Sequence, residues 1–288
     1  MAPSPITASM NAPAYSESVG IAGCGAMGLP MARSLLAAGI DVCGFDVRPA
    51  GEFGDFAGRM VSDPAEFAAR CPTVISVVRD IRQTLDLCFD QQALFAGAAR
   101  PRRLVISSTL SPRFLGKLAA RLPQGTELVD APMSGAPVAA RESRLTFMVG
   151  GDEAVVGELR PLFEAMGEAI HYLGGLGAGM TVKVVNNFVA ASSVIAVRHA
   201  IAAAQALGVA PEVLTKVMAQ SSGGTWYGDN LAAIDWADEG YDPENTIGIL
   251  EKDVNSFMDA LAGLPDFEGG EQAEMVIGNL RRLPPVDR

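Results

Sequence analysis

The sequence predicts an α/β fold: a doubly wound, mostly parallel sheet followed by a smaller all-α domain, with one long helix joining the two. Apolar strand patterns alternate with helical patterns from residue 18 to residue 166, as in chains built from βαβ units. The stretch 174–207 then passes through four glycines into a proline-free segment rich in Ala, Val, Ile and Leu, which indicates one long, mostly buried helix. No strand pattern follows, so the rest of the chain is expected to be helical.

A glycine-rich turn lies between the first strand pattern and the first helical pattern. The apolar run Ser18–Ala22 leads into Gly23-Cys24-Gly25-Ala26-Met27-Gly28, and the helical pattern behind it closes at Gly39. A second strand pattern, Ile40–Phe45, ends at Asp46. G-x-G-x-x-G in this context, with an acidic residue about twenty residues on, is typical of a Rossmann-type dinucleotide-binding unit.

The predicted cofactor-binding residues of the turn are Gly23, Gly25, Ala26, Met27 and Gly28. Glycines allow the backbone to approach a diphosphate closely, and the helix N-terminus supplies free N–H groups and positive dipole. Asp46 would accept hydrogen bonds from ribose hydroxyls and repel a 2′-phosphate, which favours NAD over NADP. Arg48, two residues on, is a positive charge that favours the opposite choice.

The alternation continues through the first part of the chain. Strands are expected at Thr73–Val78, Leu104–Ile106, Thr126–Val129 and Leu145–Val149, and helices at Asp80–Phe89, Pro112–Leu122 and Glu153–Met166. Ligands of parallel sheets bind beyond the carboxyl ends of the strands. The segments Val78-Arg79, Ser108-Thr109 and Asp130–Pro137 follow strands and are therefore candidates for the site.

Two polar residues interrupt the apolar pattern of the long helix near its start. Lys183 and Asn187 are spaced i and i+4, which places them on one face. Burying an ammonium group is unfavourable unless it is paired or used, and the lysine pKa shifts readily on burial. The alternative is a lysine whose ammonium reaches solvent at the helix end.

Composition excludes several classes of partner. The net charge of −11, from 22 Lys and Arg against 33 Asp and Glu, disfavours nucleic acid and anionic membrane surfaces. The four cysteines have no metal-ligand spacing, so no metal is expected. Residues 1–17 resemble neither a secretory signal nor a transit peptide, and the polar residues of the long helix disfavour a membrane span. A cytoplasmic protein with a flexible tail over residues 1–17 is expected.

Four blocks together resemble the β-hydroxyacid dehydrogenase family (3-hydroxyisobutyrate dehydrogenase and tartronate semialdehyde reductase type). They are GIAGCGAMGLPMARSLLAAG at 20–39, DAPMSGA at 130–136, Gly177-Ala178-Gly179 followed by Lys183 and Asn187, and Lys252-Asp253-Val254. Ser108–Pro112 is similar to a further family segment, and the resemblance covers roughly residues 18–258. It implies a dinucleotide-binding domain over 18–178 and a helical substrate and oligomerisation domain over 179–288.

The resemblance also implies roles for individual residues. Lys183 would be the general acid/base, and Ser134, Gly135, Ala136 and Asn187 would bind a small carboxylate substrate. Val78, Arg79 and Thr109 would contact the nicotinamide half of the cofactor, and Lys252 would reach the cofactor or the mouth of the site. The expected activity is NAD-dependent oxidation of a 3-hydroxyisobutyrate-like acid, or reduction of its semialdehyde, in a homodimer or homotetramer.

Two alternatives remain open at this point. An imine reductase shares the scaffold, but such relatives usually lack the lysine, and a non-catalytic cofactor-binding regulatory protein would not need it. The chain also departs from the family pattern at Arg79, at Ala136, at Glu244-Asn245 and in its closing segment. Ala136 stands where a second glycine is usual, and the segment after Asp253 is expected to lack the closing helical pattern.

Overall fold

The computed structural model describes residues 15–262, 264 and 270–286. Contacts between Cα atoms divide the chain into two compact units. Unit 1 contains the described residues up to Ser108 together with Phe114–Met180. Unit 2 contains Thr109–Arg113 together with the described residues from Thr181 onward, so the division falls inside the long helix.

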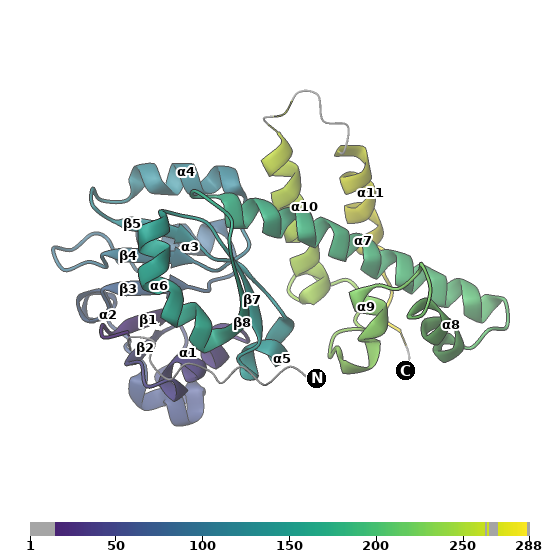
Figure 1. Cartoon of the computed structure of the whole chain (residues 1–288), viewed down its shortest axis with the longest axis horizontal. Helices are drawn as coiled ribbons and strands as arrows, with labels where there is room; N and C mark the ends of the chain where they lie inside the picture. The colour runs from purple at the N-terminus through teal and green to yellow at the C-terminus, as the bar shows by residue number, and fades with distance from the viewer. Residues whose placement is uncertain (1–14, 263, 265–269, 287–288) are drawn as a thin grey trace, which may run out of the picture. The chain divides into compact units, whose positions relative to one another are not determined.

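A parallel five-stranded sheet forms the centre of unit 1 (Figure 1). Its strands are β1 (Val19–Ala22), β2 (Val42–Phe45), β3 (Thr73–Ser76), β4 (Arg103–Ile106) and β5 (Glu127–Asp130), in the order β2-β1-β3-β4-β5. The predicted fold class is confirmed. The register pairs Ala22 with Phe45 and with Ser76, so the strands end together at one edge, where the glycine-rich turn and Asp46 follow.

Unit 1 also contains a second, three-stranded sheet, which the sequence patterns did not distinguish from the first. It consists of β6 (Met133–Ser134), β7 (Leu145–Val149) and β8 (Gly167–Tyr172), with β6 antiparallel and β8 parallel to β7. β8 begins at Gly167, directly after the helix expected over Glu153–Met166. A Cβ atom on this glycine would lie 2.2 Å from the Leu145 carbonyl oxygen, so only glycine permits this close pairing.

The helices of unit 1 extend the predicted set. They are α1 (Gly28–Ala37), α2 (Pro64–Arg70), α3 (Ile81–Cys88), α4 (Pro112–Arg121), α5 (Ala136–Arg141) and α6 (Glu153–Met166), with a 3-10 segment at Ala50–Arg59. The helix α2 was missed although its start is encoded. Asp63 accepts a hydrogen bond from the Glu66 amide and Pro64 occupies the first turn, a standard N-terminal signal.

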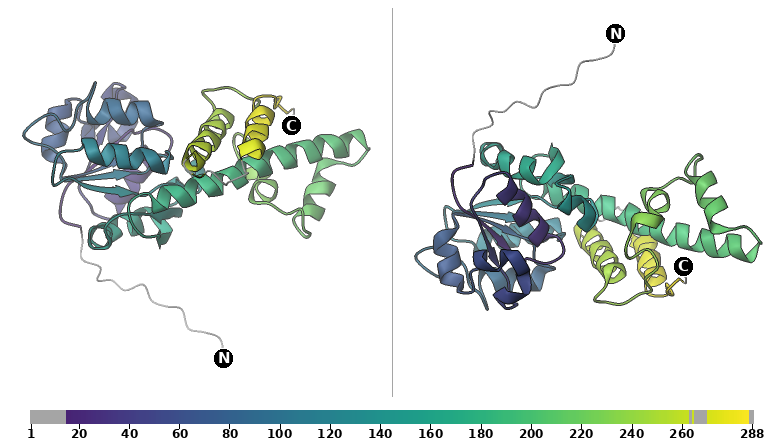
Figure 2. Two further views of the ribbon diagram at one scale, coloured as in Figure 1. Left: turned by 90° about the horizontal axis from the view of Figure 1, so that it is seen from above. Right: turned by 90° about the horizontal axis from the view of Figure 1, so that it is seen from below.

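All regular elements in the described part of unit 2 are helical, as predicted. Its elements are α7 (Ala178–Ala206), α8 (Pro211–Met218), α9 (Trp226–Asp229), a 3-10 turn at Leu231–Ala233, α10 (Thr246–Leu261) and α11 (Gly270–Leu280). α7 is one continuous helix of 29 residues (Figure 2). Its core residues include Val184, Ala191 and Val194, and Phe188 stacks on Phe257 of α10 with ring centroids 4.5 Å apart.

Helix α7 also has the length and hydropathy of a membrane span. The same properties describe the core helix of a globular domain, and 44% of its most apolar 18-residue window is buried. Lys183, Asn187 and Arg198 are themselves buried on it.

The expectation that the closing segment lacks a helical pattern is wrong. α11 runs from Gly270 to Leu280 and buries Ala273, Val276, Ile277 and Leu280, which are spaced i, i+3, i+4 and i+7. It lies beside α10 (Figure 1). The Arg281 guanidinium at its end donates to Glu251 of α10 with an N–O distance of 2.6 Å, and this pair lowers the Glu251 pKa.

Residues 1–14 of the predicted tail lie outside the described residues. Of the three residues that follow, Tyr15 contacts β3, and Glu17 pairs with Arg102, the residue before β4. The Tyr15 and Thr73 hydroxyls are 2.7 Å apart, and Arg102 donates to Glu17 at 3.0 Å.

Candidate active site

The three glycines of the turn after β1 each have a different local reason to be glycine. Gly23 has a φ of +91°, and its would-be Cβ would lie 2.9 Å from the Val77 carbonyl carbon. A Cβ on Gly28 would lie 2.0 Å from the Gly23 oxygen, so helix α1 can approach the turn only with glycine there. A Cβ on Gly25 would meet nothing within 4 Å, which leaves this exposed backbone open to a ligand.

The start of α1 has amide groups available for an anion. Met27 precedes the helix, no side chain caps it, and no acidic residue lies in its first turn. Gly25 and Ala26 are exposed on the surface beside it. Free N–H groups behind an open glycine fit a dinucleotide diphosphate, because the backbone can approach it and the helix dipole favours negative charge.

Asp46 lies directly after β2 and binds the backbone of the glycine-rich turn. Its carboxylate accepts the Cys24 amide at 2.8 Å and the Arg48 Nε at 3.0 Å. The Arg48 guanidinium also donates to the Cys24 carbonyl at 3.1 Å and lies 4.8 Å from the Phe53 ring centroid. Burial opposes ionisation of Asp46, but the hydrogen bonds from Arg48 and the Cys24 amide outweigh it and lower the pKa of the carboxyl.

Val78 lies next to the glycine-rich turn, and Arg79 is held by the helix that follows. The Val78 amide nitrogen is 3.0 Å from the would-be Cβ of Gly23, and the Val78 carbonyl accepts a hydrogen bond from the Ser108 hydroxyl. The Arg79 amide donates to the Gln83 side chain at 2.9 Å. Val78 thus lies beside the predicted diphosphate position, whereas the Arg79 amide is hydrogen-bonded to the first turn of the helix that follows.

The predicted substrate block occupies β6 and the turn into α5. Ser134, Gly135 and Ala136 are all half-buried. Gly135 has a φ of +136°, and a Cβ on it would lie 2.5 Å from the Ala139 Cβ, so the turn requires glycine at this position. Ala136 has a φ of +56° although it carries a side chain.

Asp130, the first residue of the same block, is a buried anchor that the sequence did not assign. Its carboxylate accepts the amides of Gly177 and Met180, each at 2.7 Å, at the start of α7. A Cβ on Gly150 would lie 2.6 Å from its Oδ1, so the surrounding backbone encloses the carboxylate. Burial raises the Asp130 pKa, against the effect of these amide donors.

Lys183 of α7 is buried among charged groups in unit 2. Its side chain is 7% exposed, and burial lowers the pKa of its ammonium. The negative charge of Asp253 acts to raise this pKa and the positive charge of Lys252 acts to lower it. Asn187, also 7% exposed, donates from Nδ2 to Asp253 Oδ2 at 2.6 Å.

Lys252 connects this cluster to Thr109. Its ammonium donates to the Thr109 carbonyl at 2.6 Å, and it lies 2.7 Å from Asp253 Oδ1. Asp253 therefore links two of the predicted site residues, Asn187 and Lys252, and Lys252 in turn contacts the Thr109 carbonyl. The sequence resemblance implied no role for Asp253, although it belongs to the Lys252-Asp253-Val254 block.

The segment Thr109–Arg113 is bound to α10 at a second point. The Ser111 hydroxyl donates to the Asp259 carboxylate, and Arg113 donates to the Asp259 carbonyl at 3.1 Å. Lys252 and Asp259 are seven residues apart, on one face of the helix. The face of α10 that approaches Lys183 thus also fixes the loop that carries Thr109.

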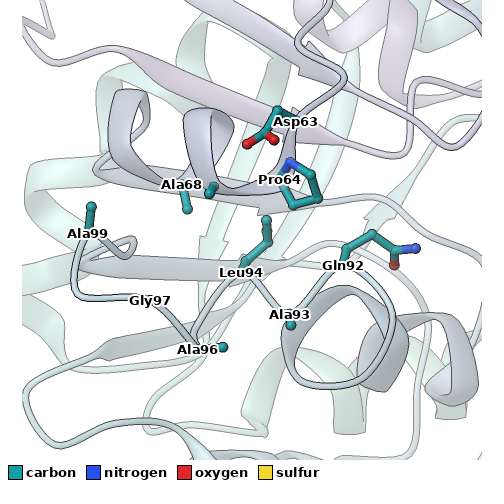
Figure 3. A pocket seen from close by; sticks show the side chains of 10 residues that line it. Asp63, Pro64, Ala68, Gln92, Ala93, Leu94, Ala96, Gly97 and Ala99 are labelled. Carbon is teal, nitrogen blue, oxygen red and sulfur yellow. The ribbon is translucent and has the colours of Figure 1, made fainter.

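None of the predicted site residues lines the cavity drawn in Figure 3. This cavity of about 270 Å³ lies between α2 and the loop 92–99, and half of its lining residues are alanines. The one carboxylate at its edge, Asp63, already caps α2. Among the residues that the structure describes, no cluster of three or more His, Cys, Asp and Glu side chains could hold a metal ion.

Two sequence-family models match the chain. The model for the NAD-binding domain of 6-phosphogluconate dehydrogenase matches residues 18–174. The model for the NAD-binding region of NADP-dependent 3-hydroxyisobutyrate dehydrogenase matches residues 177–276.

Individual proteins agree with these matches. L-threonate dehydrogenase of Cupriavidus necator is 33% identical over 249 residues, which cover 85% of this chain and 83% of that protein. NAD-dependent L-serine dehydrogenase of Pseudomonas aeruginosa is 37% identical over 213 residues, or 73% and 72% of the two chains.

Among solved structures, 3-hydroxyisobutyrate dehydrogenase of Mycobacterium tuberculosis with L-serine is similar, with a TM-score of 0.75 and 28% identity over 94% of this chain and 96% of that chain. An imine reductase from Myxococcus stipitatus, with a TM-score of 0.64, covers 92% of this chain and 93% of that chain, and at 14% identity it shares the fold alone.

Proposed function

Because the chain belongs to the β-hydroxyacid dehydrogenase family of NAD(P)-dependent oxidoreductases acting on CH–OH groups, we propose that it oxidises a small β-hydroxy acid, or reduces the corresponding semialdehyde, with Lys183 as general acid/base. The observation that carries this proposal is the buried Lys183, whose pKa is lowered and which lies one helical turn before Asn187 and near Asp253. Relatives named for threonate, serine and 3-hydroxyisobutyrate support a short hydroxylated carboxylic acid as the substrate class.

NAD, when bound, accepts or returns the hydride. In this proposal Gly25 and the amides at the start of α1 hold its diphosphate, and Asp46 accepts hydrogen bonds from the adenosine ribose. Asp46 is ionised because its pKa is lowered, so its negative charge supports a preference for NAD over NADP. Val78 and Thr109 are proposed to line the nicotinamide half.

Lys183 moves the proton that accompanies the hydride. In the oxidation direction the neutral amine accepts the proton of the substrate hydroxyl, and in reduction the ammonium donates a proton to the carbonyl oxygen. An ordinary lysine is almost fully protonated at neutral pH, so a lowered pKa increases the fraction that can act as a base. Burial of Lys183 therefore serves the proposed chemistry.

Specific side chains and amides are proposed to orient the substrate. The Ser134 hydroxyl and the amides of Ser134–Ala136 are proposed to bind its carboxylate, and Asn187 its reacting oxygen. The Asn187 amide is already oriented, since Nδ2 donates to Asp253 and Oδ1 accepts from Asn186 at 3.2 Å. One N–H of Asn187 then remains for the substrate.

We also propose that the chain functions as a homo-oligomer. Val185, Val189, Val213 and Val217 of α7 and α8 are between 47% and 61% exposed, which is unusual for so many apolar side chains on two consecutive helices. Covering them with a second copy would remove this apolar surface from water.

The test is NADH formation by the full-length protein over a panel of acids: 3-hydroxyisobutyrate, glycerate, threonate, L-serine and 4-hydroxybutyrate, with NADP in parallel. Lys183→Ala should abolish turnover, whereas the matched control Lys216→Ala, an exposed lysine of α8, should not. Tight NAD binding without turnover of any acid, or turnover indifferent to Lys183, would contradict the proposal and favour a binding protein.

A further inference from the structure

Two consecutive residues of the substrate block have positive φ angles, and only the first is glycine. Gly135 has a φ of +136° and Ala136 a φ of +56°. In the left-handed region the Cβ of an L-residue crowds the following carbonyl oxygen. Ala136 also precedes Pro137, whose ring further restricts the residue before it. The alanine is therefore strained where glycine would adopt the same backbone freely.

Packing in the core does not explain the strained methyl group. In the part of unit 1 that the structure describes, the buried core includes Ala139 and Ala140 of the same helix but not Ala136. Ala136 is half-buried. A residue held in a strained conformation without a packing role is a candidate for a functional one.

We propose that Ala136 is a specificity-determining residue, whose methyl group narrows the space beside C2 of the substrate and disfavours acids that are branched at C2. The inference rests on the proposed function, in which the amides of Ser134–Ala136 bind the carboxylate. The Ala136 Cβ is two covalent bonds from its amide nitrogen, and C2 is bonded directly to the carboxylate carbon. In the proposed binding mode, a substituent on C2 is therefore expected beside the Ala136 methyl group.

The chain provides a matched control for this inference. Ala93 has a φ of +49°, is half-buried, and belongs to unit 1, but lies in the loop after α3 and outside the substrate block. Ala93→Gly and Ala136→Gly both remove a methyl group from a left-handed alanine. Their effects on backbone strain should be alike, and any difference between them should come from the position of the methyl group.

The experiment compares 3-hydroxypropionate with 3-hydroxyisobutyrate, which differ only by a methyl group on C2, by measuring kcat/KM with NAD for the wild type and both variants. A methyl-sized contact in a pocket changes kcat/KM by about 10–200-fold. We expect Ala136→Gly to raise the ratio for the branched acid over the unbranched acid by about tenfold or more. Ala93→Gly should leave the ratio unchanged. Midpoint temperatures of unfolding are measured to check that all three proteins are folded.

Three results would overturn the inference. An unchanged ratio in Ala136→Gly, with turnover intact, would remove the role of the methyl group and leave the proposed function standing. An equal change in Ala93→Gly would assign the effect to general relief of strain. If the wild type and both variants turned over neither these two acids nor any acid of the wider panel, the proposed function and this inference would fail together.

Discussion

Helix α7 buries two cationic side chains in different surroundings. Lys183 and Arg198 are 7% and 6% exposed. The guanidinium donates to three backbone carbonyls, those of Ala237 at 2.9 Å, Glu239 at 3.1 Å and Pro284. Lys183 instead lies among charged side chains, and burial lowers its pKa.

Burial of a cation therefore does not by itself indicate a reactive group. An arginine stays protonated in proteins, so carbonyl acceptors around a buried guanidinium give it a structural role. Arg198 ties the loop around Ala237–Glu239 to the chain end near Pro284. A lysine can lose its proton. The nearby charges of both signs shift the pH at which Lys183 does so. We therefore expect Lys183 to contribute to the reaction and Arg198 to contribute to the stability of the fold.

The largest effect that would test this contrast is the loss of Lys183. We expect Lys183→Met to lower the rate of NAD-linked turnover by about 10²–10⁴-fold, the range for removal of a general acid/base. The variant should unfold at an equal or higher temperature at pH 7, because it no longer buries an ionisable amine. The Lys183 pKa in the folded protein lies below its unfolded value of 10.5, so burying the protonated lysine destabilises the wild type at lower pH. The stability that Lys183→Met gains over the wild type should therefore disappear as the pH approaches 10.5. A loss of activity explained by unfolding would remove the contrast.

The reverse result is expected at Arg198. Arg198→Met removes the charged donor from the three backbone carbonyls that accept from it. We expect this to lower the free energy of unfolding by on the order of 3 kcal/mol. The activity of the folded fraction should stay close to that of the wild type. Denaturant unfolding and turnover are measured beside Arg282→Met, an exposed arginine in the same unit. A variant as stable as the wild type but inactive would contradict the structural role.

Most of the fold could be predicted because local patterns encode it. The strands of the main sheet are short apolar runs, and the glycine-rich turn, Asp46, and the Lys183–Asn187 spacing are readable from neighbouring residues. The start of α2 and the apolar period of α11 are equally local and could have been recognised. The short strand β6 and the division into two sheets could not, since two residues carry no period.

The missed site residues depend on contacts between distant parts of the chain. Asp253 lies 66 residues from Asn187, and Asp130 lies 47 residues from Gly177. An aspartate has the same sequence appearance whether it caps a helix, pairs at the surface or orients an amide. Only the packing of α10 against α7 shows that Asp253 joins Lys252 and Asn187.

Asp253 is the partner that most distinguishes the surroundings of Lys183 from those of Arg198, and its removal gives the smallest of these effects. Asp253→Asn keeps the shape of the side chain but removes a negative charge that raises the Lys183 pKa, so this pKa should fall further. In the oxidation direction the limb of the pH–rate profile that reports a neutral lysine should therefore shift to lower pH. The maximal rate should decrease by about tenfold, because the Asn187 amide loses its charged acceptor and its fixed orientation.

The control for this shift is Asp235→Asn, which makes the same charge change at an exposed site in unit 2. Its pH–rate profile should coincide with that of the wild type. If Asp253→Asn moved the limb to higher pH, or moved it no further than Asp235→Asn does, the titrating group would not be Lys183. The lysine would then be equivalent to Arg198, a buried cation that the fold requires and the reaction does not.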